Sequence, residues 1–172
     1  MTDITARTIL HSVGPQGQEL YSCLGRYPKF VHAEHMRHRT GSYSVSSSRA
    51  IPVARNLEEV RSDELRAAPV WWGREQRGMQ SGEELSDEYD PEFYWCTTPR
   101  QGARHVWAMA AATAANRAEE LRQLGAHKSI VNRILEPFLH VNVLWTTALP
   151  GLLNFFGLRL DQAAQPEMRA FA

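Results

Sequence analysis

The feature that most constrains the fold is the alanine-rich stretch Ala103–Leu124. Alanine has the highest helix propensity, and Val106, Leu121 and Leu124 fall on or near one face of a helix drawn over this stretch. Gly125 follows where a helix-terminating glycine belongs. Because small side chains occupy both sides of this helix, we expect it to pack closely against another helix, within the subunit or across a subunit interface.

Shorter elements are expected around this helix. Further helices are predicted over Phe30–His38, Asn56–Arg66 with Asn56 as N-cap, Ser129–Leu135, Leu152–Leu158 and Asp161–Ala170. Phe138–Thr147 is rich in Val, Leu, Trp and Thr, which favours a strand. Ile9–Leu24 is predicted to be a loop followed by a short ordered segment. Loops are also predicted in the serine-rich Thr40–Ser48 and in the long excursion Trp71–Pro91. Helices outnumber strands, so we predict an α+β fold.

Composition and charge exclude several classes of protein. The 172 residues suit a single domain over residues 1–172, and 19 basic residues balance 19 acidic ones. No overall field therefore attracts nucleic acid or an anionic membrane. The most apolar stretch, Phe138–Leu158, is interrupted by polar residues and by Pro150, so we expect no membrane span. Cys23 and Cys96, in a chain whose first ten residues show no secretory signal, are expected to be reduced. A soluble cytoplasmic protein is predicted.

The segment Arg37–Arg49 is the strongest functional signal. It reads Arg-His-Arg-Thr-Gly-Ser-Tyr-Ser-Val-Ser-Ser-Ser-Arg, so three arginines bracket a run of small hydroxyl residues. Arginine binds phosphate through a planar fork of donors, and small residues let backbone N–H groups approach an anion. The segment therefore predicts a loop that binds a phosphorylated ligand. Two alternatives stay open: a solvated loop, and a metal site at His32, His35 and His38, which the flanking arginines disfavour.

Three blocks of the sequence resemble the flavin-dependent thymidylate synthases. Arg37-His38-Arg39, Ser42 and Ser47-x-Arg49 follow the family signature Arg-His-Arg, two residues, Ser, x, Asn-Glu, x, Ser, x, Arg-Tyr. The other similar blocks are Asn154–Arg159 with Ala164–Arg169, and His127–Pro137, which corresponds to the segment with a nucleotide-binding arginine. Ser47–Pro52 and Trp72–Gln80 resemble the phage-type branch of the family.

The chain also departs from the family pattern. The departures are Ser44-Val45 for Asn-Glu, Ala50 for Tyr, Ala148-Leu149-Pro150 for Asn-x-Arg, and Glu34 for glutamine. These positions bear on the flavin contacts and on the choice of nucleotide.

The resemblance implies a fold in which helices pack around a small, mostly antiparallel sheet. It implies C5 methylation of dUMP or UMP without a cysteine nucleophile. In this family reduced FAD supplies the hydride, methylenetetrahydrofolate supplies the carbon, and NADPH regenerates the flavin. The resemblance further implies a homotetramer whose active sites are shared between subunits.

The site residues are assigned by their positions in these motifs. Arg159 is the catalytic candidate, because a cation must stabilise the negative charge that develops at O4 and N3 of the base. The expected substrate-binding residues are Glu34, Arg37, Ser47, Ser48, Arg49, Arg133 and Arg159. The expected cofactor-binding residues are His11, Arg37, His38, Arg39, Ser44, Val45, Ala148 and Asn154, and no metal ligand is assigned.

Other roles stay open at this stage. Arg159 can be read as a surface arginine and Asn154 as a helix cap, while Trp71, Trp72, Trp107 and Trp145 are most simply core or interface residues. The choice between dUMP and UMP is open, because a nucleoside-antibiotic branch that methylates UMP resembles this family. A third hypothesis, motivated by the lost Asn-Glu pair, is a nucleotide- or RNA-binding protein that keeps the fold without catalysis.

Overall fold

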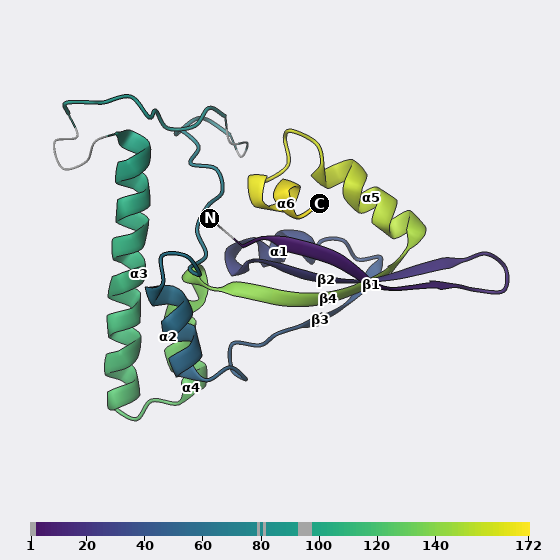
Figure 1. Cartoon of the computed structure of the whole chain (residues 1–172), viewed down its shortest axis with the longest axis horizontal. Coiled ribbons are helices and arrows are strands. Elements are labelled where there is room, and N and C mark those ends of the chain that lie inside the picture. The colour runs from purple at the N-terminus through teal and green to yellow at the C-terminus, as the bar shows by residue number, and fades with distance from the viewer. Residues whose placement is uncertain (1–2, 79, 81, 93–97) are drawn as a thin grey trace.

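The computed structural model describes residues 3–78, 80, 82–92 and 98–172 and has an α+β fold built on a four-stranded antiparallel sheet (Figure 1). The strands are β1 (Thr5–Val13), β2 (Glu19–Pro28), β3 (Gly41–Val45) and β4 (His140–Ala148), in the order β1-β2-β4-β3. The central strands pair from Leu20 opposite Ala148 to Pro28 opposite His140. The predicted strand Phe138–Thr147 and the antiparallel sheet are confirmed.

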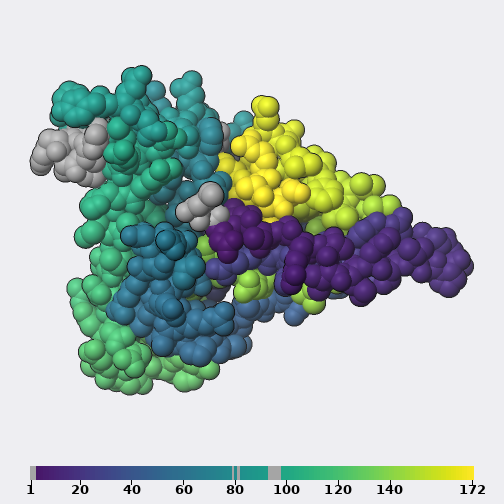
Figure 2. Space-filling view, in the orientation of Figure 1, coloured from purple at the N-terminus to yellow at the C-terminus, as the bar shows by residue number. Residues whose placement is uncertain are grey.

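β1 and β2 form a hairpin that extends beyond the rest of the molecule (Figures 1 and 2). In its turn, Gly14 N donates to Gln18 O at 2.8 Å and Gly17 adopts φ of 80°, a conformation that glycine reaches without strain. The loop predicted in Ile9–Leu24 is confined to the turn around Gly14–Gly17, because Ile9–Val13 pairs as part of β1, and the short ordered segment predicted after the loop is the start of β2.

The helices are interspersed with the strands along the chain. They are the 3-10 turn η1 (Lys29–Val31), α1 (His32–His35), α2 (Val53–Arg61), α3 (Pro99–Gln123), α4 (Lys128–Leu135), the 3-10 turn η2 (Glu136–Phe138), α5 (Leu149–Arg159) and α6 (Pro166–Phe171). The C-terminal helices α5 and α6 cover one face of the sheet (Figure 1). Val143 and Trp145 of β4 are buried there against Phe155 and Phe171, because alternate residues of a strand share a face.

A second core lies between α2, α3 and α4, beside the end of the sheet (Figure 1). Ala111, Ala115 and Ala118 of α3 are fully buried against Leu57 of α2 and Leu135 of α4. The close packing predicted for the alanine-rich helix is therefore confirmed within the subunit. Its C-terminus is confirmed as well, since Gly125 has φ of 80°.

Three local predictions need correction. Asn56 is not an N-cap: it is buried within α2, which begins at Val53 directly after Pro52. The segment Thr40–Ser48 is not all loop, because Gly41–Val45 pairs with β4 as β3. Its serine-rich composition conceals an alternation in which Tyr43 and Val45 pack on the core of the sheet. The helix expected over Phe30–His38 is present only as the short η1 and α1.

The excursion Trp71–Pro91 is confirmed as loop-rich over its described part. A two-residue ladder holds it, with Arg74 N donating to Glu83 O and Leu85 N to Trp72 O, each at 2.7 Å. A hydrogen bond from Arg100 Nη1 to Glu84 Oε2 (2.5 Å) ties it to the start of α3. This segment is therefore anchored to the body of the protein.

Two further expectations concern cysteines and membranes. Cys23 is a free cysteine, whereas Cys96 lies outside the described residues. Across the described part of the chain, no helix is long and apolar enough to cross a membrane.

Replacing Gly25 with alanine is expected to destabilise the fold. A Cβ at this position of β2 would lie 2.5 Å from Phe171 Cε2, so α6 must move away from the sheet. Such overpacking costs about 1–3 kcal/mol, measurable as a lower free energy of unfolding in urea. Gly157→Ala is the matched control, because nothing lies within 4 Å of its Cβ position and alanine favours the helix α5. Equal stability of Gly25→Ala and wild type would contradict this packing.

Candidate functional site

Arg159, the last residue of α5, is held by two contacts with the segment after β2. Its Nε donates to His38 Nε2 at 2.8 Å, and its Nη2 donates to the backbone oxygen of Glu34 at 3.3 Å. The Glu34 carboxylate lies 3.8 Å from Nη1. Only 15% of the Arg159 side chain is exposed, so the surface-arginine alternative is wrong and the guanidinium has a fixed direction.

His38 takes part as a neutral acceptor. Burial lowers its pKa, and the neighbouring Arg159 charge lowers it further, while Glu34 opposes the shift. Because Nε2 accepts from Arg159, the ring proton of the neutral histidine sits on Nδ1. Tyr43 fixes the backbone of this turn, since its hydroxyl donates to the backbone oxygens of His35 (3.0 Å) and His38 (2.7 Å). The strand β3 therefore positions the acceptor that positions Arg159.

A cavity of about 660 Å³ opens beside this cluster. Its lining includes Phe30, Glu34, Arg37, Trp71, Gln80 and Arg159, together with the turn into α6. This volume lies within the range of small-molecule sites. Arg37 is 72% exposed and paired with the Glu34 carboxylate at 3.2 Å. The lining of the cavity thus includes two guanidinium groups, of Arg37 and Arg159, and two carboxylates, of Glu34 and Glu167.

The wall of this Arg159 cavity is stabilised from α6. The buried Glu167 accepts a hydrogen bond from Val70 N at 3.0 Å, and Trp71 Nε1 donates to Gly82 O at 3.1 Å. These bonds fix the start of the excursion, and with it Trp71, against the C-terminal helices.

The loop that follows β3 and carries Ser47, Ser48 and Arg49 lies elsewhere, against α4. Asn132 Nδ2 donates to the backbone oxygens of Ser48 (2.7 Å) and Ile51 (3.0 Å). Ser48 Oγ donates to Glu136 Oε1, and Lys29 Nζ pairs with the same oxygen, both at 2.5 Å. Burial opposes ionisation of Glu136, but the bonds from Lys29 and Ser48 outweigh it and lower its pKa.

The phosphate-binding candidates of this loop are therefore gathered near α4 and do not line the Arg159 cavity. Ser47, Arg49 and Arg133 are exposed. The positive charge of Arg133, one turn earlier on α4, contributes to the lowered pKa of Glu136. Within one chain, the two halves of the predicted site remain apart.

Most of the expected flavin-contacting residues are exposed and scattered. His11 lies on the β1–β2 hairpin, stacked on Tyr21 at 4.4 Å and bonded to Glu19 at 2.8 Å. Asn154 is exposed within α5, so it does not cap that helix. The others are Arg39 after α1, Ser44 and Val45 on β3, and Ala148 at the end of β4.

The three regularly spaced histidines have protein partners. The Tyr27 hydroxyl lies 2.9 Å from His32 Nδ1 and 2.8 Å from His35 Nδ1, and His38 is bonded to Arg159. Across the described residues, no group of three His, Cys, Asp or Glu side chains could hold a metal ion. The geometry therefore contradicts the metal-site alternative for these histidines.

Several residues that organise the site were missed by the sequence-based assignment. They are Tyr27, Lys29, Tyr43, Asn132, Glu136 and Glu167. Tyr43, Asn132, Glu136 and Glu167 lie inside the motif blocks, so proximity to a motif was an available signal for them. Tyr27 and Lys29 act through tertiary contacts that no local pattern reveals.

Comparisons with known proteins agree with this fold. The model of the family described as thymidylate synthase complementing protein matches residues 22–172. The UMP/dUMP methylase PolB from Streptomyces cacaoi bound with 5-Br dUMP is similar, with a TM-score of 0.69 and 17% identity over 99% of this chain and 86% of that one. The same protein bound with 5-Br UMP gives a TM-score of 0.62 and 15% identity, with the same coverage. At such identities the likeness shows a shared fold. No curated protein sequence matches the chain.

Protonation of His35 is expected to destabilise the fold on acidification. Burial lowers the pKa of His35 from 6.5 to about 3, and the neighbouring His38, His32 and Arg159 add to the shift. The unfolded chain therefore binds a proton that the native state excludes. This contribution to stability is complete above pH 6.5 and is lost as the pH falls towards 3. Between about pH 7.5 and about pH 5 the loss is roughly 2 kcal/mol.

Urea unfolding of wild type and His35→Asn at both pH values measures this loss. Asparagine keeps an acceptor for Tyr27 but does not titrate, so the variant should lose roughly 2 kcal/mol less on acidification, whatever its stability at neutral pH. The same pH dependence in both proteins would contradict a buried neutral His35.

Proposed function

Because the chain belongs to the thymidylate synthase complementing protein family, we propose that it transfers a one-carbon unit to C5 of a uridine monophosphate, dUMP or UMP. The observation that carries the proposal is the Arg159 guanidinium, which His38 and Glu34 hold at the wall of a 660 Å³ cavity. The similar PolB structures, which hold 5-Br dUMP and 5-Br UMP, support this ligand class.

Arg159 is the residue that we assign to catalysis. For C5 to become nucleophilic towards a one-carbon donor, negative charge must gather on O4 and N3 of the pyrimidine. A cation that is already oriented and shielded from water stabilises that charge without reorganisation. Arg159 meets both conditions, since two hydrogen bonds fix it and 15% of its side chain is exposed. Glu34 and Arg37, which line the same cavity, are assigned to the edge of the base.

The nucleotide phosphate is assigned to the loop beside α4. Ser47, Arg49 and Arg133 are exposed there, and guanidinium groups bind phosphate through paired hydrogen bonds. Ser48 Oγ is bonded to Glu136, so an incoming phosphate would take over this hydroxyl. Lys29, which pairs with the same Glu136 carboxylate, would then remain as the counter-ion of Glu136.

We assign these two halves to one site built from different subunits of a homotetramer. In a single chain the loop residues do not line the Arg159 cavity. All nine residues of β1 are exposed, including the apolar Ile9, Leu10 and Val13. Exposed apolar groups on an edge strand suit a subunit interface.

The residues proposed to hold FAD suit a cofactor bound at such an interface. The side chains of Arg39 and Asn154 are exposed and, within the described part of the chain, make no hydrogen bond or ion pair. His11 and Arg37 offer further exposed donors, while the small side chains of Ser44 and Ala148, with Val45, leave space. His38 would act through Arg159. When bound, reduced FAD supplies the hydride, methylenetetrahydrofolate supplies the carbon, and NADPH reduces the flavin.

The proposed enzyme acts in the cytoplasm.

An assay of tritium release from [5-³H]dUMP and [5-³H]UMP, with FAD, NADPH and methylenetetrahydrofolate, tests the proposal. We expect release from at least one nucleotide, and the ratio of the two rates identifies the substrate. Arg159→Lys should lower kcat about 10²–10³-fold, because lysine cannot reproduce the fixed planar cation. Arg61→Lys, at an exposed arginine of α2, is the matched control. Inertness towards both nucleotides, with RNA binding that weakens steeply in salt, would favour the binding-protein hypothesis instead.

Mixing two inactive variants tests the shared site. If Arg159 and Arg133 of one site come from different subunits, Arg159→Lys and Arg133→Gln should each be nearly inactive alone. Hybrid tetramers formed by mixing them contain some sites with both wild-type arginines and should regain part of the activity. Mixtures as inactive as their components would show that both residues of a site belong to one subunit.

A further inference from the structure

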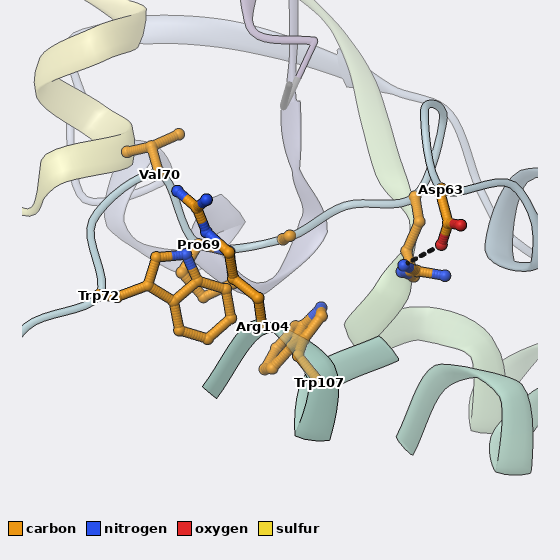
Figure 3. Close-up of a pocket in the computed structure, with 8 residues that line it drawn as sticks. Asp63, Pro69, Val70, Trp72, Arg104 and Trp107 are labelled. Carbon is orange, nitrogen blue, oxygen red and sulfur yellow. Dashed lines mark hydrogen bonds and ion pairs between the residues drawn. The ribbon is translucent and has the colours of Figure 1, made fainter. Parts of the chain in front are cut away.

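A second cavity of about 490 Å³ lies between α3 and the segment Asp63–Trp72 (Figure 3). It is lined by Asp63, Arg66, Ala68, Pro69, Val70, Trp72, Arg104 and Trp107. Pro69 lines both cavities, and Val70 N is bonded to Glu167, which lines the Arg159 cavity. We call this second cavity the tryptophan–arginine pocket. The proposed methylation makes no use of it.

Two indole rings form rigid walls of this pocket. Their centroids are 6.2 Å apart, with the planes of Trp72 and Trp107 at 81°. Trp107 Nε1 donates to Ala67 O at 3.0 Å, and its ring packs edge-on against Phe138 at 5.3 Å. The backbone of Trp72 is held in the short ladder of the excursion. Fixed aromatic surfaces of this kind bind a planar ring at little cost in side-chain entropy.

The two arginines of the pocket differ in how they are neutralised. The side chain of Arg66 is 11% exposed and pairs with Asp63 at 2.7 Å, so its charge is balanced. Arg104 is exposed, and in the described part of the chain its guanidinium makes no hydrogen bond or ion pair. Figure 3 shows the Arg104 side chain beside Trp72 at the other end of the pocket from Asp63. The pocket therefore combines aromatic walls with the guanidinium of Arg104, which has no acidic partner among the described residues.

We propose that the tryptophan–arginine pocket binds an aromatic anion, a planar ring that carries a carboxylate or a phosphate. The ring lies against Trp72 and Trp107, and the anionic group binds the Arg104 guanidinium through paired hydrogen bonds. The proposal does not depend on the methylation reaction. It has a consequence for it, however, because Trp71 lines the Arg159 cavity while Trp72, the next residue, lines this pocket. A ligand here contacts the segment that forms a wall of the Arg159 cavity.

Two probes distinguish the possible sources of the anion: p-aminobenzoyl-L-glutamate, an aryl carboxylate, and adenosine 5′-monophosphate, an aromatic phosphate. Each is titrated into the full-length protein by calorimetry and by quenching of tryptophan fluorescence. We expect at least one probe to bind and Arg104→Gln to weaken its binding about tenfold, a loss of about 1.4 kcal/mol. Arg55→Gln, at an exposed arginine of α2, should leave the Kd unchanged. Benzamide, a neutral ring, should bind far more weakly.

Two outcomes would overturn the proposal. In the first, neither probe binds, or the Kd is the same for wild type and Arg104→Gln. In the second, Arg159→Lys abolishes probe binding while Arg104→Gln does not, which places the probe in the Arg159 cavity. Arg104 is exposed, so its substitution should leave the fold intact, and the far-UV circular dichroism and Tm of the variant check this. Binding of dUMP to Arg104→Gln, measured separately, shows whether the nucleotide site stands or fails by itself.

Discussion

The antiparallel pairing of β2 with β4 is the constraint on which the rest of the molecule depends. These strands come from opposite ends of the chain, and their register runs from Leu20 opposite Ala148 to Pro28 opposite His140. The chain leaves β2 into η1 and α1, which carry Glu34, and leaves β4 into α5, which carries Arg159. The hydrogen bond between His38 and Arg159 spans 121 residues of sequence. A slip of one residue would turn Trp145 and its neighbours to the wrong face and separate the two groups.

Burial gives the Arg159 cluster its electrostatic character. It keeps His35 and His38 neutral, so Arg159 stands beside them as a fixed positive charge without a competing imidazolium. The same burial raises the pKa of Tyr43 to about 12, and its hydroxyl remains a donor to the backbone of the turn. A row of polar groups inside an aromatic core thus serves to orient one guanidinium. The cost of burying them is offset because most of their polar atoms are hydrogen-bonded.

The sequence predicted those elements whose signal is local. The helix α3 and the strand β4 follow from alanine content and from β-branched and aromatic residues. The α+β fold followed from the balance of predicted helices and strands, and the family followed from motifs. The strands β1 and β3 were missed, because Gly and Ser weaken the local signal and pairing with a distant strand decides the outcome. Glu34, His38 and Arg159 had been assigned to the site from separate motifs, and in the structure they lie next to one another. The separation of Arg133 from that group is a property of tertiary structure, which motif order does not encode.

If the chain forms the proposed homotetramer, the long hairpin has a consequence for the newly made subunit. β1 is an edge strand of the sheet, and Ile9, Leu10 and Val13 on it are at least half exposed. An open edge with apolar side chains is a template for any other strand that meets it. In a newly synthesised chain, association with another subunit of the proposed homotetramer therefore competes with the pairing of β1 to strands of other proteins. For such a protein, the rate of synthesis relative to the rate of subunit encounter sets the soluble yield. The residues of the hairpin are then constrained by the need to avoid aggregation as well as by their role in the proposed reaction.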